Sequence, residues 1–116
     1  MLDWPLAEIR QLQLFIEEAV RATHTEWRHA PRLVAWAIVN RNGSCHGRHL
    51  HSAAWSGIYY LDGDVGSACT VFEIDRASIR VAPEPGLMVV FPSNTWHSVE
   101  LHQSPEPRIT IAFDAK

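Results

Sequence analysis

The sequence has little net charge, few cysteines and no long hydrophobic run, and each of these absences excludes a class of protein. Ten basic and thirteen acidic residues among 116 give a formal net charge of −3. Without a basic cluster we expect neither a nucleic acid nor a membrane surface as a partner. The apolar runs are only a few residues long, far below the roughly 20 residues that a transmembrane helix needs.

The only cysteines are Cys45 and Cys69. A lone pair is not a disulfide framework and no signal peptide precedes it, so we expect reduced thiols in a cytoplasmic protein. Neither internal repeats nor low-complexity segments are visible. Since 47% of the residues are hydrophobic, the chain can bury one core, and we expect a single domain over residues 1–116.

The first 30 residues are predicted to form a helical segment. Asp3 is a candidate N-cap, Pro5 suits the first turn and Glu8 is favoured there. A buried stripe packed on the protein's own sheet is the ordinary interpretation, and a partner-binding helix is the alternative. The apolar residues at helical spacing are Leu6, Ile9, Leu12, Phe15, Ile16, Ala19 and Val20, with Trp27 as a further candidate.

After Pro31 the pattern changes from helical to extended. About eight short strands separated by turns are typical of an antiparallel barrel, so we predict a mainly β fold with an N-terminal helix. The expected barrel is a jelly roll, or double-stranded β-helix, over residues 31–116. The expected strands include residues 33–39, 56–61, 69–74, 78–82, 87–91, 96–101 and 108–113.

Three histidines are the candidate metal ligands. His49 and His51 are two residues apart, so their side chains point to the same face of an extended chain. His97 follows the turn after the predicted strand 87–91. Early and late strands of a small jelly roll lie side by side, so the three imidazoles can converge on one metal ion. A surface or hydrogen-bonded pair is the alternative for His49 and His51.

Four further polar residues are not expected to bind the metal. His46 lies an odd number of residues from His49 and should face away from it. His102 lies beyond the end of a predicted strand and should be solvated. Asp62 and Asp64 lie beyond the end of another, so we do not expect their carboxylates to reach the ion.

Part of this pattern resembles the cupins, a family of jelly-roll barrels. Five residues separate a glycine from the His-x-His pair, and a second motif has the cupin spacing of glycine, proline and histidine. A cupin glutamate is missing from residues 52–56, and Asn94 stands where a second glycine is usual. The matching residues are Gly43, His49, His51, Gly86, Pro92 and His97.

A second set of motif elements extends over residues 33–116. Its residues are Trp36, Asn40, Gly43, His49-Leu50-His51, Ser56-Gly57-Ile58-Tyr59-Tyr60-Leu61, Phe91-Pro92-Ser93, His97 and Arg108-Ile109-Thr110-Ile111-Ala112-Phe113. In this set the chain more closely resembles the small 2-oxoglutarate and Fe(II)-dependent oxygenases. Several unrelated elements occur in the family's order and at compatible spacings, which a chance His-x-His would not bring.

The oxygenase resemblance implies roles for six residues. Arg108 would pair with the distal carboxylate of 2-oxoglutarate, since a guanidinium binds a carboxylate through two parallel hydrogen bonds. Thr110 would bond beside it on the same strand face, and Tyr60 would donate its hydroxyl to the same carboxylate. A surface charge is the alternative for Arg108, and a core tyrosine is the alternative for Tyr60. The implied Fe(II) ligands are His49, His51 and His97.

One departure concerns the ligand set. Most of these oxygenases use two histidines and one carboxylate, and His51 stands at the position of that carboxylate. Three neutral imidazoles leave the charge of Fe(II) uncompensated by the protein. Binding of the 2-oxoglutarate dianion would neutralise it.

The function that the resemblance implies is hydroxylation of a small-molecule or peptide substrate, with Fe(II) as cofactor and 2-oxoglutarate as cosubstrate. The sequence does not identify that substrate, and it allows a homodimer. One alternative is a cupin-like three-histidine metalloenzyme such as a thiol dioxygenase, in which Arg108 binds a substrate carboxylate directly. Another is a non-catalytic barrel that binds a metal or small ligand, although structural zinc usually has four protein donors.

Overall fold

The computed structural model describes residues 7–23, 27, 29, 31–64 and 66–116. The proposed N-cap Asp3 and the first-turn Pro5 lie outside these residues. In the described part, one helix precedes a series of strands, in agreement with the prediction. The elements are α1 (Ala7–Arg21), β1 (Leu33–Asn40), β2 (His46–His49), β3 (Trp55–Asp62), β4 (Thr70–Ile74), β5 (Ala77–Val81), β6 (Met88–Pro92), β7 (His97–Val99) and β8 (Arg108–Ala115).

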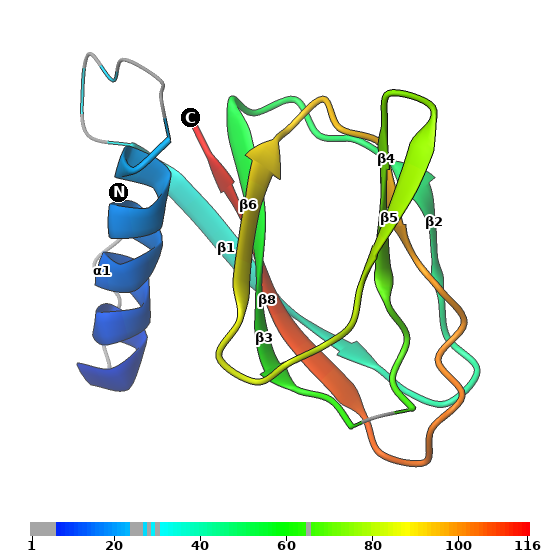
Figure 1. Cartoon of the computed structure of the whole chain (residues 1–116). Helices are drawn as coiled ribbons and strands as arrows, with labels where there is room; N and C mark the ends of the chain where they lie inside the picture. Colours follow the sequence, from blue (N-terminus) through cyan, green and yellow to red (C-terminus); the bar gives the residue numbers. More distant parts are fainter. Residues whose placement is uncertain (1–6, 24–26, 28, 30, 65) are drawn as a thin grey trace.

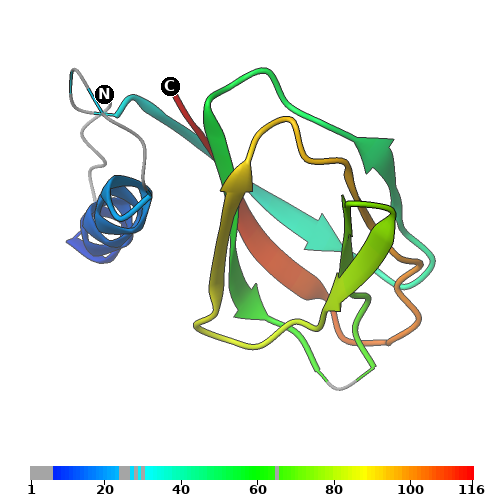
Figure 2. The ribbon, with the colours of Figure 1, turned by 45° about the horizontal axis from the view of Figure 1, so that its top comes forward.

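The strands form two four-stranded antiparallel sheets that face each other (Figures 1 and 2). One sheet has the order β1-β8-β3-β6 and the other has the order β2-β7-β4-β5. Each sheet therefore places early strands beside late ones, as a jelly roll does. The predicted fold class, a jelly-roll or cupin-like barrel behind an N-terminal helix, is confirmed.

Helix α1 covers the outer side of the β1-β8-β3-β6 sheet (Figure 1). Burial of each large apolar side chain there stabilises the fold by about 1.5–3 kcal/mol. Phe15 departs from the predicted stripe, because it is 47% exposed, and its ring packs edge to face with that of Tyr59 at 6.2 Å between centroids. The buried residues of this cluster are Ile16, Val20, Leu33, Phe113 and Ala115.

A second apolar cluster lies on the inner faces of the two sheets. Ile58 and Tyr60 come from β3, Phe91 from β6 and Phe72 from β4. The rings of Phe72 and Phe91 meet edge to face, with centroids 4.8 Å apart. This cluster joins the sheets and forms an apolar wall beside His97, whose ring lies 4.9 Å from that of Phe91.

Two motif glycines adopt backbone angles that other residues rarely adopt. Gly43 and Gly86 both have φ of 91°, in the turns that follow β1 and precede β6. The amide of Gly43 donates to the carbonyl of His102, and that of Gly86 donates to the carbonyl of Tyr60. These turns lead the chain into the segments that carry the histidines.

No helix among the described residues is long and apolar enough to cross a membrane. Both cysteines are free thiols, Cys45 exposed and Cys69 buried. Burial raises the pKa of the Cys69 thiol, which therefore keeps its proton at neutral pH.

Candidate metal centre

The three predicted ligands lie together. His49 ends β2 and is paired in register with His97, which begins β7. His51 follows β2, and its backbone amide donates to the carbonyl of Ser93 at 2.9 Å. One nitrogen from each of the three rings lies within 4.8 Å of the other two. The structure thus brings the three histidines into a single cluster, as the spacing predicts.

Each imidazole is held by an oxygen atom at its Nδ1 position. A neutral imidazole has one N–H group and one lone pair, so a ring that donates through Nδ1 keeps its lone pair on Nε2. The arrangement therefore selects Nε2 as the metal-binding atom in all three rings. The Nδ1 contacts are His49 to the Gly47 carbonyl at 2.7 Å, His97 to the Thr95 carbonyl at 2.9 Å and His51 to Asp114 Oδ2 at 3.2 Å.

This donor set fits a divalent first-row ion such as iron. Imidazole nitrogen suits Fe, Zn, Cu and Ni, and three ligands on one side leave positions for other molecules. His97 is only 4% exposed, and this burial lowers its pKa below the ordinary histidine value of 6.5. The ring therefore favours the neutral form, which is the form that binds a metal.

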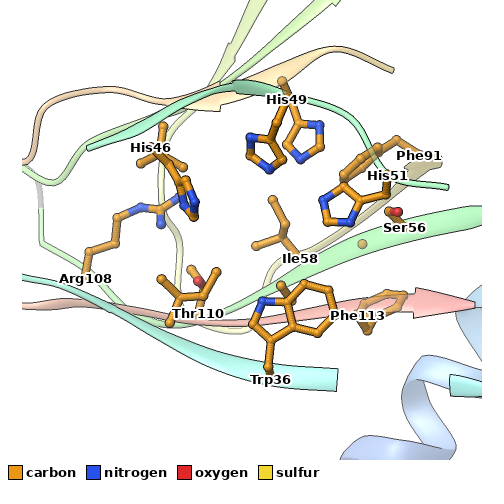
Figure 3. A pocket seen from close by; sticks show the side chains of 15 residues that line it. Trp36, His46, His49, His51, Ser56, Ile58, Phe91, Arg108, Thr110 and Phe113 are labelled. Atoms are coloured by element: carbon orange, nitrogen blue, oxygen red, sulfur yellow. The ribbon is translucent and has the colours of Figure 1, made fainter. Parts of the chain in front are cut away.

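A pocket of about 240 Å³ opens beside the three histidines, between the two sheets. Figure 3 shows Arg108 and Thr110 at one side of it, His49 and His51 at the other, and Ile58 between them. Arg108 and Thr110 are alternate residues of β8, so they share a strand face as predicted. The pocket therefore offers metal ligands at one end and a cation at the other.

Arg108 is buried, with 1% of its surface exposed, and three protein oxygens hold its guanidinium. Nε donates to the carbonyl of Ala68 at 3.0 Å, Nη1 to Oδ1 of Asn40 at 3.0 Å and Nη2 to Oγ1 of Thr70 at 2.8 Å. A guanidinium has five N–H groups. These contacts use three of them and leave one on each terminal nitrogen.

Arg108 is not a surface charge at a strand edge, which was the alternative. Among the described residues its hydrogen-bond acceptors are a carbonyl, an amide and a hydroxyl oxygen, and it forms no ion pair. Burial lowers the pKa of its guanidinium, yet arginine stays protonated in proteins. A buried cation without an anion is costly, so the site favours an anionic ligand.

Tyr60 lies beside Arg108, but the structure gives its hydroxyl another partner. This hydroxyl is 2.7 Å from Oγ1 of Thr70, and the Tyr60 ring centroid is 5.5 Å from Cζ of Arg108. The side chain is fully buried and does not line the pocket, whereas Thr110 does. Burial raises the pKa of Tyr60, so its hydroxyl stays neutral. Its contact with a cosubstrate stays a prediction.

The expectation that His46 faces away from His49 is wrong. His46 lines the pocket, and its ring centroid is 5.0 Å from that of His49. The pairing of β2 with β7 shifts register between these two residues. Such a bulge adds a residue and breaks the two-residue alternation on which the expectation rested.

The expectation that His102 is solvated is also wrong. The side chain is fully buried, with Nε2 bonded to the carbonyl of Glu106 at 2.7 Å and Nδ1 accepting from the amide of Ala68 at 3.3 Å. It thus ties the segment between β7 and β8 to the segment before β4. This role is structural.

The aspartates near the end of β3 take no part in the metal cluster, as expected. Asp62 accepts from the amide of Gly63, and Asp64 accepts from Oγ of Ser104 at 2.8 Å. The hydrogen bond from Ser104, with further bonds from Ser67 and the amide of Gly66, lowers the pKa of Asp64.

Sequence reasoning missed Asp114, whose carboxylate accepts from His51. The signal was present, because Asp114 continues the alternation of Arg108 and Thr110 along one face of β8. An acidic residue at an inward position of an apolar strand needs a partner.

Two tryptophans near the histidines in the sequence motifs lie in different settings. Trp36 lines the pocket and stacks on His51, with ring centroids 6.0 Å apart. Trp96 lies outside the pocket lining, 38% exposed, under the guanidinium of Arg48, which also pairs with Glu73. Neither forms part of a positive groove in the described structure, so we do not expect them to stack on nucleic acid.

Residues 73–114 match the family model described as "Putative 2OG-Fe(II) oxygenase". The matched segment contains His97, Arg108, Thr110 and Asp114. The chain resembles the 2-oxoglutarate and Fe(II)-dependent oxygenases. This match confirms the resemblance that the sequence motifs indicated. A comparison with curated proteins found no match.

Solved structures support the fold. An oxidoreductase of the 2OG-Fe(II) oxygenase family from Burkholderia pseudomallei is similar over 100% of this chain and 60% of its own, at 15% identity and a TM-score of 0.73. A Pseudomonas putida prolyl-4-hydroxylase is similar over 94% and 62%, at 20% identity and a TM-score of 0.63. A cupin domain from Bordetella pertussis is similar over 78% of this chain and 88% of its own, at 14% identity and a TM-score of 0.55.

These likenesses establish the jelly-roll fold alone, because the identities are low. The chain spans 60% and 62% of the length of the two oxygenase-related structures.

Proposed function

We propose that this protein is an Fe(II)- and 2-oxoglutarate-dependent oxygenase. The observation that carries the proposal is the buried guanidinium of Arg108, which lines the same pocket as the three histidines and has no carboxylate partner among the described residues. A matching ligand has a carboxylate at one end and a metal-chelating group at the other. 2-Oxoglutarate has both.

Different residues of the pocket would bind the metal and the cosubstrate. His49, His51 and His97 would hold the iron from one side through their Nε2 atoms. When bound, Fe(II) supplies the redox chemistry that couples O₂ to conversion of 2-oxoglutarate into succinate and CO₂. Arg108 would hold the distal carboxylate with its two remaining N–H groups, beside Thr110. Orientation of a ligand in this way lowers the barrier of the reaction that follows.

Apolar side chains form part of the pocket wall and would limit the access of water to the groups that react. Trp36, Ile58 and Phe91 contribute apolar surface around the three histidines. Exclusion of water strengthens each electrostatic contact inside and limits side reactions. The hydroxylated substrate would be a small molecule or a peptide.

A cupin-like three-histidine metalloenzyme is the second candidate. The observation in its favour is that the cluster of possible ligands contains three imidazoles and no carboxylate. In that function Arg108 would bind the carboxylate of the substrate itself, as in an enzyme that oxidises an amino-acid thiol, and no keto acid would be needed.

Calorimetric titration of the Fe(II) protein without oxygen separates the two candidates. 2-Oxoglutarate should bind, and 2-oxobutyrate, which lacks the distal carboxylate, should bind about ten-fold or more weakly, since hydrogen bonds to charged groups contribute about 1.5–3 kcal/mol. Equal binding of the two keto acids would contradict the role of Arg108. Binding of cysteine without binding of either keto acid would favour the second candidate.

A further inference from the structure

Asp114 connects the end of β8 to the metal-binding histidines. Its Oδ2 accepts from Nδ1 of His51 at 3.2 Å, and its Oδ1 accepts from Oγ of Ser56 at 2.6 Å. The side chains of Asp114 and His51 are 18% and 20% exposed, so water screens this contact only in part. Asp114 is not itself in the group of possible metal ligands.

Two buried serines fix the carboxylate of Asp114. Oγ of Ser56 lies 2.7 Å from Oγ of Ser93, and the two residues are 2% and 1% exposed. A hydroxyl has one hydrogen. Since Ser56 donates that hydrogen to Asp114, Ser93 is the donor to Ser56. The backbone carbonyl of Ser93 also accepts from the amide of His51. The network therefore contacts His51 twice, at its ring through Asp114 and at its backbone through Ser93.

His51 differs from the other two histidines in the charge of its acceptor. The Nδ1 groups of His49 and His97 donate to neutral backbone carbonyls, whereas that of His51 donates to a carboxylate. A carboxylate at this position fixes the tautomer and orientation of the ring, and it raises the basicity of the metal-binding nitrogen.

We propose that Asp114 is a positioning residue which holds His51 with its lone pair toward the metal and supplies, through that ring, the negative charge that three neutral imidazoles lack. The usual triad has a carboxylate bound directly to the ion. Here the carboxylate of Asp114 would act on the ion through the ring of His51, to which it is hydrogen-bonded. The inference rests on the metal-binding part of the proposed function. It does not depend on 2-oxoglutarate or on catalysis.

Titration of the metal-free protein with Co²⁺ alone measures the effect of the charge. Asp114→Asn keeps the shape and an acceptor oxygen but removes the charge, and we expect it to weaken Co²⁺ binding about 10–100-fold. Asp62→Asn is the matched control, because it removes the same charge at an exposed position outside the cluster. It should leave Co²⁺ binding unchanged.

Nitrogen-15 NMR of the metal-free protein, at a pH well above the pKa range of imidazole, measures which tautomer the His51 ring adopts. Wild type and Asp114→Asn should show the Nδ1–H tautomer, because both offer an acceptor oxygen. Asp114→Leu offers none and should shift His51 toward the Nε2–H tautomer. A general loss of stability would not select one tautomer of one ring.

The outcomes separate this inference from the proposed function. A wild type that fails to bind Co²⁺ would contradict the metal centre, and the role of Asp114 with it. A wild type that binds Co²⁺ no more tightly than Asp114→Asn would overturn the role of Asp114 alone. An unchanged His51 tautomer in Asp114→Leu would do the same.

Discussion

Asn40 and Arg108 lie directly opposite each other on β1 and β8, and Nη1 of Arg108 donates to Oδ1 of Asn40 at 3.0 Å. The two side chains are 5% and 1% exposed. The neutral amide of Asn40 accepts a hydrogen bond from the guanidinium and does not neutralise its charge. The pairing thus holds Arg108 in place and leaves its charge available to a ligand.

Replacing Asn40 with aspartate should therefore weaken 2-oxoglutarate binding. The new carboxylate has the same shape but would form an ion pair with Arg108 and compete with the distal carboxylate of the ligand. We expect a loss of about ten-fold or more in 2-oxoglutarate affinity by calorimetry, with Co²⁺ affinity unchanged.

Ser44→Ala is the control for Asn40→Asp. It removes a second side-chain contact of Asn40 without adding a charge, and it should leave 2-oxoglutarate affinity as it is. If Asn40→Asp binds 2-oxoglutarate as well as wild type, the guanidinium is not the anion site.

Each of the three histidines should be needed for metal binding. His97→Ala removes a buried ligand, and the two that remain lack the geometry to hold the ion, so most of the affinity should be lost. Metal analysis after loading and desalting measures this, with His102→Gln as a buried histidine outside the cluster. Full metal occupancy in His97→Ala would contradict the three-histidine centre.

The metal-free protein should lose stability as the pH falls below the ordinary histidine range. Burial lowers the pKa of His97 in the folded state, so His97 binds a proton more weakly in the folded chain than in the unfolded chain. The stability that neutral His97 contributes is fully present above the unfolded pKa of about 6.5, and it is lost as the pH falls from there to the lower pKa of the folded state. Urea unfolding at several pH values should show a smaller pH dependence for His97→Gln than for wild type.

Gly57 should not tolerate a side chain. A Cβ atom at this position would overlap the ring of Phe113, which is 1% exposed and packed against α1. Overpacking of this kind costs about 1–3 kcal/mol, so the free energy of unfolding of Gly57→Ala should fall by that amount. Gly47→Ala is the control, because no atom lies within 4 Å of its new Cβ. Equal stability of the two variants would contradict the packing.

The fold and the metal cluster could be predicted because they depend on local patterns. Two-residue alternation places Arg108 and Thr110 on one face, and the glycine turns at Gly43 and Gly86 mark the segments that bring His49 and His97 together. Such patterns are repeated along a short stretch of chain, so they are visible in the sequence.

The missed features depend on contacts between distant segments. The bulge in β2 turns His46 into the pocket, and nothing in the adjacent residues signals it. His102 is buried because Ala68 and Glu106 meet it from two loops. The partner of His51 is Asp114, 63 residues away. Such contacts form when segments far apart in the sequence meet in the fold, so the local pattern does not contain them.

The most direct test of the central claim is 2-oxoglutarate binding to the oxygen-free Fe(II) forms of wild type, Arg108→Ala and Arg108→Lys. Chelation of Fe(II) by a keto acid gives a visible charge-transfer band, which reports binding. Wild type should develop this band, and Arg108→Ala should bind 2-oxoglutarate more weakly by about 2 kcal/mol or more, because a buried charge-assisted pair is lost. Arg108→Lys should recover only part, since an ammonium lacks the planar fork. Unchanged Co²⁺ affinity and circular dichroism would show that the variants are folded. No band for wild type at millimolar 2-oxoglutarate, or equal affinity in folded Arg108→Ala, would contradict the assignment.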